Sequence, residues 1–277
     1  MVQNNMLGPG EYEAFQKYLQ DACGIVLGSG KEYLVTSRLS SLLQSNTIAS
    51  VGQLLRELNK VSNKSLRVSI IDAMTTNETF WFRDMPHYRL LMDMIFPEAE
   101  SKPRKSMRIW SAACSSGQEP YNISMTVQQY LSANPGRLSG GVDIIGTDIS
   151  TKMLEEAKKG IYCGIAASRG LSADQSKRFF IPRDECLEVR PEIRKRVSFR
   201  HHNMTESYAL MGRFDVIFCR NVLIYFSAQK KADIIERMAR TLNPKGYLFL
   251  GSTESLTAHS DLFEMVSKNG GIVYRLK

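Results

Sequence analysis

The feature that most constrains the fold of this chain is an alternation of short apolar runs with helical patterns, which begins at residue 108. Strands are expected at residues 108–112, 142–146, 197–201, 214–219, 247–250 and 272–276. A segment with apolar residues at helical spacing follows each of the first two strands, and another such segment lies at residues 230–242. Alternating strands and helices predict an α/β fold built on a doubly wound parallel sheet.

Two segments depart from this alternation. Residues 1–75 contain four stripes of apolar residues at helical spacing and few strand signals, so we expect a small all-α N-terminal domain. Residues 76–277 then form the second domain. Within it, residues 160–196 carry several glycines and prolines, and we expect a small inserted β-subdomain there. Residues 97–105 include two prolines and predict a polar loop.

The charge of the chain is unevenly distributed. Its formal net charge is +8, and residues 158–200 hold eleven Lys and Arg against five Asp and Glu. This local surplus favours a surface for an acidic partner, and an ordinary solvated face is the alternative. The first residues lack the apolar core of a signal peptide, and no apolar run approaches the roughly 18 residues that span a bilayer. We therefore predict a cytoplasmic protein that does not insert into the membrane.

The cysteines and histidines show no metal-binding pattern. Five cysteines are scattered along the chain without a C-x-x-C pair: Cys23, Cys114, Cys163, Cys186 and Cys219. They are interpreted as reduced thiols that form neither a disulfide nor a zinc site. His201 and His202 have no nearby acids or cysteines at ligand spacing, so no metal is expected.

Candidate chemistry lies where the first two strands end, because ligands of open α/β sheets bind at the carboxyl ends of the strands. Small residues follow the first strand in SAACSSGQEP at residues 111–120, and Asp148 ends the second strand. An acid at that position is suited to ribose hydroxyls. The turn has one glycine and lacks G-x-G-x-x-G, which disfavours a dinucleotide and leaves S-adenosylmethionine as the better candidate.

Three segments carry a resemblance to a known family. They are TNETFWFRD at residues 76–84, SAACSSGQEPY at residues 111–121 and FDVIFCRNVLIYF at residues 214–226. In order and spacing they resemble the CheR-type chemotaxis receptor methyltransferases, over nearly the whole chain. The resemblance implies a Rossmann-like methyltransferase sheet and S-adenosylmethionine as cofactor, with S-adenosylhomocysteine as product. It also implies methylation of glutamate side chains in the cytoplasmic domain of methyl-accepting chemotaxis receptors.

The resemblance also implies which residues form the site. The positions that match cofactor-binding residues of the family are Asn77, Thr79, Arg83, Glu119, Asp148, Asn203, Met204, Arg220 and Asn221, with Met204 in place of a common Leu. Arg83 and Tyr225 match the residues placed near the transferred methyl group. Taken singly, Asn77 also suits a helix cap, Arg83 an ion pair, Asn221 a turn and Tyr225 a packed core.

The expected chemistry is simple. A glutamate side chain has an ordinary pKa of about 4.3, so at pH 7 it is ionised roughly 500 to 1 and needs no general base. The enzyme must desolvate that carboxylate and aim it at an electrophilic methyl group. Tyr225 is expected to donate its hydroxyl to one carboxylate oxygen. Arg83 is expected to hold a carboxylate, either that of the substrate or that of the cofactor.

Recognition of the receptor is expected to use basic side chains. Arg56, Lys60, Lys64 and Arg67 recur at spacings of three to four residues, and a solvated helix face is the alternative. Some members of the family hold a C-terminal receptor pentapeptide with a longer, glycine-containing loop. Residues 182–188 are short and lack glycine, which predicts that this chain does not depend on the pentapeptide.

A nucleic-acid methyltransferase is the main alternative function, because the sequence pI is about 9.2. The chain lacks the N-P-P-Y-like turn typical of amine methylation, and Cys219 follows Phe218 where a cytosine-C5 enzyme usually has proline before the cysteine. The sequence therefore favours a protein substrate and predicts no nucleic-acid partner.

Overall fold

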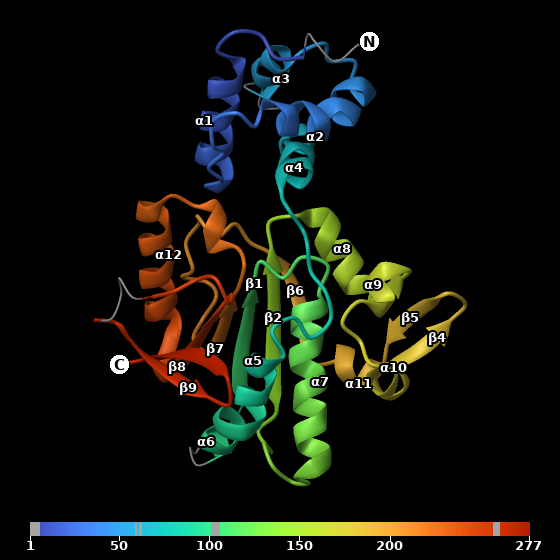
Figure 1. Ribbon diagram of the computed structural model, residues 1–277, viewed down its shortest axis with the longest axis vertical. Helices are drawn as coiled ribbons and strands as arrows, with labels where there is room; N and C mark the ends of the chain where they lie inside the picture. The colour runs from blue at the N-terminus through green and yellow to red at the C-terminus, as the bar shows by residue number, and fades with distance from the viewer. Residues whose placement is uncertain (1–5, 59, 61–62, 101–105, 257–260) are drawn as a thin grey trace.

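The computed structural model describes residues 6–58, 60, 63–100, 106–256 and 261–277. Its N-terminal part contains four helices, α1 (Glu11–Cys23), α2 (Glu32–Ser45), α3 (Val51–Leu58) and α4 (Lys64–Met74), at the top of Figure 1. Their apolar stripes form a core of their own, which includes Phe15, Leu19, Val35, Leu39 and Leu54. The predicted all-α N-terminal domain is confirmed.

The main sheet occupies the centre of Figure 1. In the described residues its strands are β1 (Met107–Ala112), β2 (Val142–Asp148), β6 (Val197–His201), β7 (Phe214–Cys219), β8 (Leu242–Leu250), β9 (Phe263–Lys268) and β10 (Gly271–Leu276). Their order is β6-β2-β1-β7-β8-β10-β9. The first five are parallel, whereas β10 runs antiparallel to both β8 and β9.

The predicted Rossmann-like sheet is confirmed, with one correction. The sheet is mixed, because a hairpin of β9 and β10 completes it and β9 was not expected. The turn at residues 269–270 joins two adjacent strands, and adjacent strands joined by a tight turn must be antiparallel. β8 is also longer than residues 247–250, since it starts directly after α12 (Ala228–Thr241).

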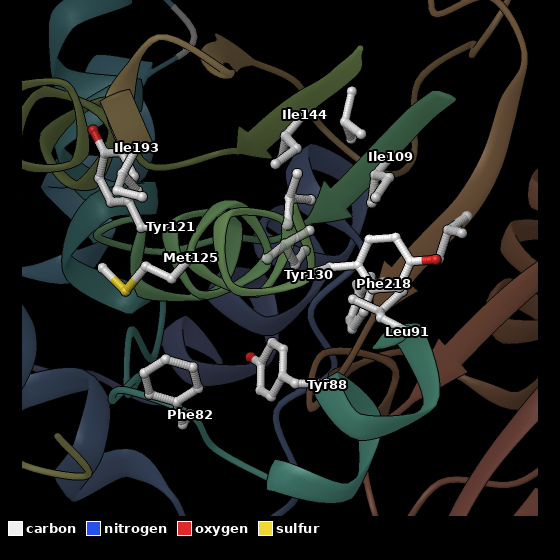
Figure 2. Close-up of a cluster of buried hydrophobic side chains, with 14 of the residues drawn as sticks. Phe82, Tyr88, Leu91, Ile109, Tyr121, Met125, Tyr130, Ile144, Ile193 and Phe218 are labelled. Atoms are coloured by element: carbon white, nitrogen blue, oxygen red, sulfur yellow. The ribbon is translucent and has the colours of Figure 1, made fainter. Parts of the chain in front are cut away.

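Alternate side chains of the central strands cover two faces of the sheet. One face meets α7 (Gln118–Ala133), as Figure 2 shows for Tyr121, Met125 and Tyr130 beside Ile109, Ile144 and Phe218. The other face presents Trp110, Ile145, Ile217 and Leu248 to Ile234, Ile235 and Met238 of α12. Helix α8 (Thr151–Lys159) packs beside β2 and β6. Helices on both faces make the sheet doubly wound.

A run of short helices leads into β1. It comprises α5 (Met85–Leu90), the π-helix η2 (Leu91–Ile95) and α6 (Phe96–Glu100). The predicted polar loop at residues 97–105 is therefore wrong for residues 97–100, and residues 101–105 lie outside the described residues. Pro97 lies in the first turn of α6, which follows the π-helix directly, and the fully buried Phe96 packs into the apolar core.

The insert between α8 and β6 contains β3 (Ile161–Cys163), α9 (Ile165–Ser168), α10 (Ala173–Phe179), β4 (Phe180–Arg183), β5 (Cys186–Val189) and α11 (Pro191–Arg194). Its strands form an antiparallel sheet in the order β3-β5-β4, at the right of Figure 1. Phe179, Phe180 and Ile193 belong to the same apolar core as α7, so the insert is joined firmly to the sheet domain.

The insert also corrects the interpretation of the cysteines. Cys163 and Cys186 are opposite each other on β3 and β5 and form a disulfide. They are 23 residues apart, so only the strand register brings them together. Cys23, Cys114 and Cys219 are free and buried. The prediction that all five cysteines are unpaired thiols is wrong for this pair.

Candidate active site

A cavity of about 260 Å³ lies at the carboxyl ends of β1, β2, β6 and β7. The order of the sheet changes direction here, because β2 and β6 lie on one side of β1 and β7 and β8 on the other. All ten residues predicted for the site line it: Asn77, Thr79, Arg83, Glu119, Asp148, Asn203, Met204, Arg220, Asn221 and Tyr225. They come from the end of β2, from the segments that follow β6 and β7, from the first turn of α7 and from the segment that joins the two domains.

The turn after β1 brings backbone close to the cavity. Ala113 and Ser115 have left-handed φ values of 56° and 49°, and Gly117 follows with 92°. A Cβ at Gly117 would lie 2.8 Å from the Cβ of Ala157 on α8, so only glycine allows this approach. The small residues therefore serve a tight turn, as the sequence predicted.

Asp148 is the most enclosed acid of the cavity, with 5% of its surface exposed. Its Oδ2 accepts the N–H of Ser115 at 2.7 Å and its Oδ1 accepts the N–H of Ser150 at 2.8 Å. Burial raises its pKa, and the backbone hydrogen bonds oppose that rise. Each carboxylate oxygen has capacity for a second donor, which suits the two hydroxyls of a ribose.

Arg220 and Glu119 form a buried ion pair. Nη1 of Arg220 lies 2.7 Å from Oε2 of Glu119, whose Oε1 accepts the Ser111 hydroxyl at 2.7 Å. Nη2 of Arg220 lies 2.6 Å from Oδ2 of Asp84. Burial alone would lower the pKa of Arg220, but the charges of Glu119 and Asp84 outweigh it and raise the pKa. Both terminal nitrogens of Arg220 therefore bind protein groups.

Asn221 has a left-handed φ of 57° and is held by an acid that the sequence did not reveal. Oε2 of Glu254 accepts the N–H of Asn221 at 2.8 Å, and Oε1 accepts the N–H of Leu223 at 3.0 Å. Glu254 lies four residues beyond β8 and belongs to no recognisable motif. Its position after the fifth parallel strand is the one signal that could have indicated it.

Asn203 and Met204 follow β6 and are nearly buried. The side-chain amide of Asn203 donates to the carbonyl of Ala22 on α1 at 2.9 Å, and its Oδ1 accepts the hydroxyl of Thr205 at 2.8 Å. Asn203 thus ties the N-terminal domain to the loop after β6. Met204 supplies an apolar wall.

Arg83 and Tyr225 reach the cavity from different elements. Nη1 of Arg83 donates to the carbonyl of Glu78 at 3.4 Å, a long hydrogen bond. Among the described residues, no group forms a hydrogen bond with the Tyr225 hydroxyl, whereas its carbonyl accepts the N–H of Val26 at 2.9 Å. The alternative considered for Arg83 was an ion pair near Asp84, but Asp84 forms its ion pair with Arg220.

The N-terminal domain contributes more to the cavity than the sequence predicted. Val26, Leu27, Lys31 and Arg38 line it. Arg38 donates to the carbonyl of Met74 at 2.6 Å and to the hydroxyl of Thr76 at 2.9 Å, which holds the start of the connecting segment. Nothing in the helical periodicity distinguishes these positions, because it only separates core from surface.

Two of the four basic residues proposed for docking have other partners. Lys60 lies 2.7 Å from Glu57, and Arg67 donates to the carbonyl of Leu58 at 2.7 Å near the end of α3. Arg56 and Lys64 are exposed. The docking role of these four residues stays a prediction.

The donors and apolar surfaces of the cavity fit a nucleoside joined to an amino acid. Asp148 offers acceptors for ribose hydroxyls, Glu119 and Arg83 offer charges to an amino and a carboxylate group, and Met204 and Val26 offer apolar surface. Within the described residues, no three His, Cys, Asp or Glu gather to hold a metal. In the same residues, no helix is long and apolar enough to cross a membrane.

Comparison with known proteins agrees with this geometry. Residues 77–272 match the family of the CheR methyltransferase SAM-binding domain, and residues 10–75 match the CheR methyltransferase all-alpha domain. The chain is 49% identical to a chemotaxis protein methyltransferase of Vibrio parahaemolyticus, over 96% of this chain and 97% of the relative. It is 46% identical to the chemotaxis protein methyltransferase Cher2 of Pseudomonas putida, over 96% of this chain and 98% of the relative. The chain therefore belongs to the CheR family of S-adenosylmethionine-dependent chemotaxis protein methyltransferases.

Proposed function

We propose that this protein methylates glutamate side chains in the cytoplasmic helices of chemotaxis receptors, giving glutamate methyl esters and S-adenosylhomocysteine. The observation that carries the proposal is the convergence of Arg83 and Tyr225 on the cavity that also contains Asp148 and Glu119. One cavity thus combines groups suited to a nucleoside amino acid with two side chains that can bind a carboxylate.

The chemistry asks little of the protein beyond positioning. The cofactor supplies an electrophilic methyl group on a positively charged sulfur. A glutamate with an ordinary pKa of about 4.3 is already ionised at pH 7, so no base has to remove a proton. The protein residues must bring the carboxylate into place and exclude water around it.

Tyr225 and Arg83 are the residues that we assign to this task. The Tyr225 hydroxyl, which has no hydrogen-bond partner among the described residues, donates to one oxygen of the substrate carboxylate and leaves the other oxygen to attack. The guanidinium of Arg83 presents several donors in one plane and holds a carboxylate. The remaining residues that we assign to the cofactor are Asn77, Thr79, Glu119, Asp148, Asn203, Met204 and Asn221. Arg220 matches a cofactor position of the family and lines the same cavity, but both of its terminal nitrogens bind protein oxygens.

The proposed partner is the acidic helical domain of a chemotaxis receptor, and the proposed location is the cytoplasm, where that domain lies. Residues 1–75 and 76–277 act as two domains in this proposal, with the insert at about 160–196. The basic surplus of residues 158–200 and the exposed Arg56 and Lys64 provide positive charge for the encounter.

The proposal is tested by methyl transfer from tritiated S-adenosylmethionine to receptor-containing membranes, followed by treatment with alkali. Release of volatile methanol is expected, because base hydrolyses a carboxyl methyl ester. A reaction without enzyme serves as control. Label that survives alkali would identify N- or C-methylation and contradict the proposal.

The nucleic-acid alternative has little support. A cytosine-C5 enzyme needs a reactive thiolate, but Cys219 is fully buried, and burial raises the pKa of its thiol well above the ordinary value. We expect no salt-sensitive mobility shift when the protein is mixed with RNA or duplex DNA.

We also propose that the protein does not need a receptor C-terminal pentapeptide. β4 ends at Arg183 and β5 starts at Cys186, so two residues form the whole turn of that hairpin. Such a turn offers little backbone to clasp a peptide. Calorimetric titration with the pentapeptide should show no heat of binding, whereas micromolar affinity would refute this part of the proposal.

A further inference from the structure

Arg220 directs its guanidinium into the protein although it lines the cavity. Its side chain is 3% exposed and pairs with Asp84 and Glu119 at 2.6 and 2.7 Å. Nη2 also donates to the carbonyl of Arg83 at 2.8 Å. These bonds join three segments that are distant in sequence: the end of β7, the first turn of α7 and the segment before α5.

The segment that Arg220 holds has an unfavourable backbone. Phe82 has a φ of 51° and Asp84 a φ of 57°, so left-handed residues flank Arg83 on both sides. For a bulky residue such as Phe82 this conformation is uncommon and persists only where the surroundings impose it. Asp84 is the N-cap residue of α5, but its side chain makes no capping hydrogen bond and binds Arg220 instead.

The direction in which Arg83 enters the cavity depends on this backbone. Its own side chain makes one long hydrogen bond, 3.4 Å, to the carbonyl of Glu78. The cation–π contact with Phe80, at 5.5 Å, is also distant. The firmest link to Arg83 is therefore the bond from Arg220 to its carbonyl.

We propose that Arg220 is a positioning residue: its guanidinium holds Phe82 and Asp84 in their left-handed conformation and thereby fixes Arg83 between them in the cavity, rather than binding the cofactor. The inference rests on the proposed catalytic role of Arg83. Substitution of Asp84 distinguishes a positioning role of Arg220 from a cofactor-binding role, because Asp84 binds Arg220 but does not line the cavity.

Lysine cannot replace Arg220 in this arrangement. The guanidinium reaches Glu119 with one nitrogen, and Asp84 and the Arg83 carbonyl with the other. A single ammonium group is a point charge and cannot span these partners in one plane. Arg220→Lys keeps the positive charge near Glu119, so this variant tests geometry more than charge.

The experiment compares Asp84→Asn, Arg220→Lys and their double variant with wild type. Asp143→Asn, an exposed acid on β2 that does not line the cavity, is the matched control. Hydrogen exchange of the peptide covering residues 80–84, measured by mass spectrometry without ligand, reports the conformation of the segment. Calorimetry with S-adenosylhomocysteine reports binding, and base-labile methyl transfer reports kcat.

We expect Asp84→Asn and Arg220→Lys each to speed exchange of residues 80–84 and to lower kcat by roughly tenfold or more, because a partly buried charge-assisted hydrogen bond is weakened or lost. The affinity for S-adenosylhomocysteine should change by less than about threefold in Asp84→Asn. The double variant should be little worse than either single variant, because both break one link. Asp143→Asn should match wild type.

The opposite pattern would overturn the inference. It fails if Asp84→Asn exchanges and turns over like wild type while Arg220→Lys binds S-adenosylhomocysteine much more weakly, since Arg220 would then be a cofactor contact. The inference also fails if Asp84→Asn and Arg220→Lys speed hydrogen exchange of residues 80–84 but leave kcat unchanged. If wild type itself forms no base-labile ester, the proposed function fails instead, and the exchange experiment still reports on the link between Arg220 and Asp84.

Discussion

Asp148 and Arg220 show how two charged residues at equivalent strand ends acquire different roles. Both come at the carboxyl end of a parallel strand and both line the same cavity. Asp148 receives backbone N–H groups and retains acceptor capacity, whereas Arg220 uses its terminal nitrogens on protein oxygens. Arg220 therefore fits a supporting role better than a binding one.

Tyr225→Phe tests the assignment of the hydroxyl at the same scale. We expect kcat to fall by about tenfold or more while the affinity for S-adenosylhomocysteine stays within about twofold, because the hydroxyl acts only on the substrate carboxylate. Steady-state kinetics and calorimetry check this. Tyr274→Phe makes the same chemical change on β10, away from the cavity, and should behave like wild type. A large loss of cofactor affinity in Tyr225→Phe would contradict the assignment.

His87 provides a prediction about pH. Its pKa is lowered from 6.5 to about 4, first by burial and then by the charge of Arg220, with Asp84 opposing. Below pH 6.5 the unfolded chain binds a proton that the folded chain does not, so stability falls as pH drops from about 6.5 to about 4.

By pH 4 the loss should approach about 3 kcal/mol of unfolding free energy. His87→Phe should remove that part of the pH dependence, because phenylalanine does not titrate and can pack beside Phe249. Urea denaturation between pH 4 and 7 measures it. If the unfolding free energy of the variant and of wild type fell equally as the pH was lowered, His87 would be protonated in the folded state as readily as in the unfolded state.

At the scale of elements, helix α1 completes the cavity. The amide of Asn203 and the N–H of Val26 link α1 and the residues after it to the sheet domain. Gly24 ends α1 with a φ of 77°, and a Cβ there would lie 2.8 Å from the ring of Phe226. This contact between Gly24 and Phe226 is what allows the N-terminal domain to lie against the loop after β7.

Gly24→Ala should therefore weaken cofactor binding by at least about tenfold, since the added methyl group pushes α1 away from the cavity. Gly10→Ala is the matched control, because Gly10 precedes α1 with a φ of 73° and open space around its Cβ position. Both variants should lose about 1 kcal/mol of stability to the left-handed backbone. Calorimetry with S-adenosylhomocysteine separates them, and equal affinities would contradict the predicted contact.

At the scale of the whole molecule, the two domains share one ligand cavity. Besides Asn203 and Val26, the hydroxyl of Thr151 at the start of α8 bonds to Asp72 of α4 at 3.2 Å. A ligand in the cavity touches both sides of this junction, so it should stabilise both domains together.

S-adenosylhomocysteine at 100 times its Kd should raise the unfolding free energy by about 2.7 kcal/mol. That corresponds to a Tm increase of roughly 5 °C in a chain of this size. Asp148→Asn should abolish most of the increase, because a neutral amide cannot accept the same hydrogen bonds. A thermal scan in which only part of the transition shifts would show that the domains unfold independently of one another.

The local patterns of the sequence were sufficient to predict much of the secondary structure and part of the site. Apolar residues at helical spacing located the N-terminal helices, since each helix needs one apolar face. Short apolar runs located the parallel strands, since such strands are buried on both faces. The end of the second strand indicated Asp148, the family resemblance implied Glu119 and Tyr225, and all three line the cavity. Strand β9 and helix α6 were missed, because a weak apolar pattern and a proline gave no clear signal.

The sequence by itself therefore determined the fold class and, through its resemblance to a family, ten of the residues that line the cavity. Both depend on patterns within a few neighbouring positions. Only the tertiary structure decided what those residues contact. Arg220 meets Asp84 across 136 positions, Asn203 meets Ala22 across 181, and Cys163 pairs with Cys186 through strand register. Such contacts arise when packed elements bring distant segments together, and no local periodicity encodes which side chains then meet.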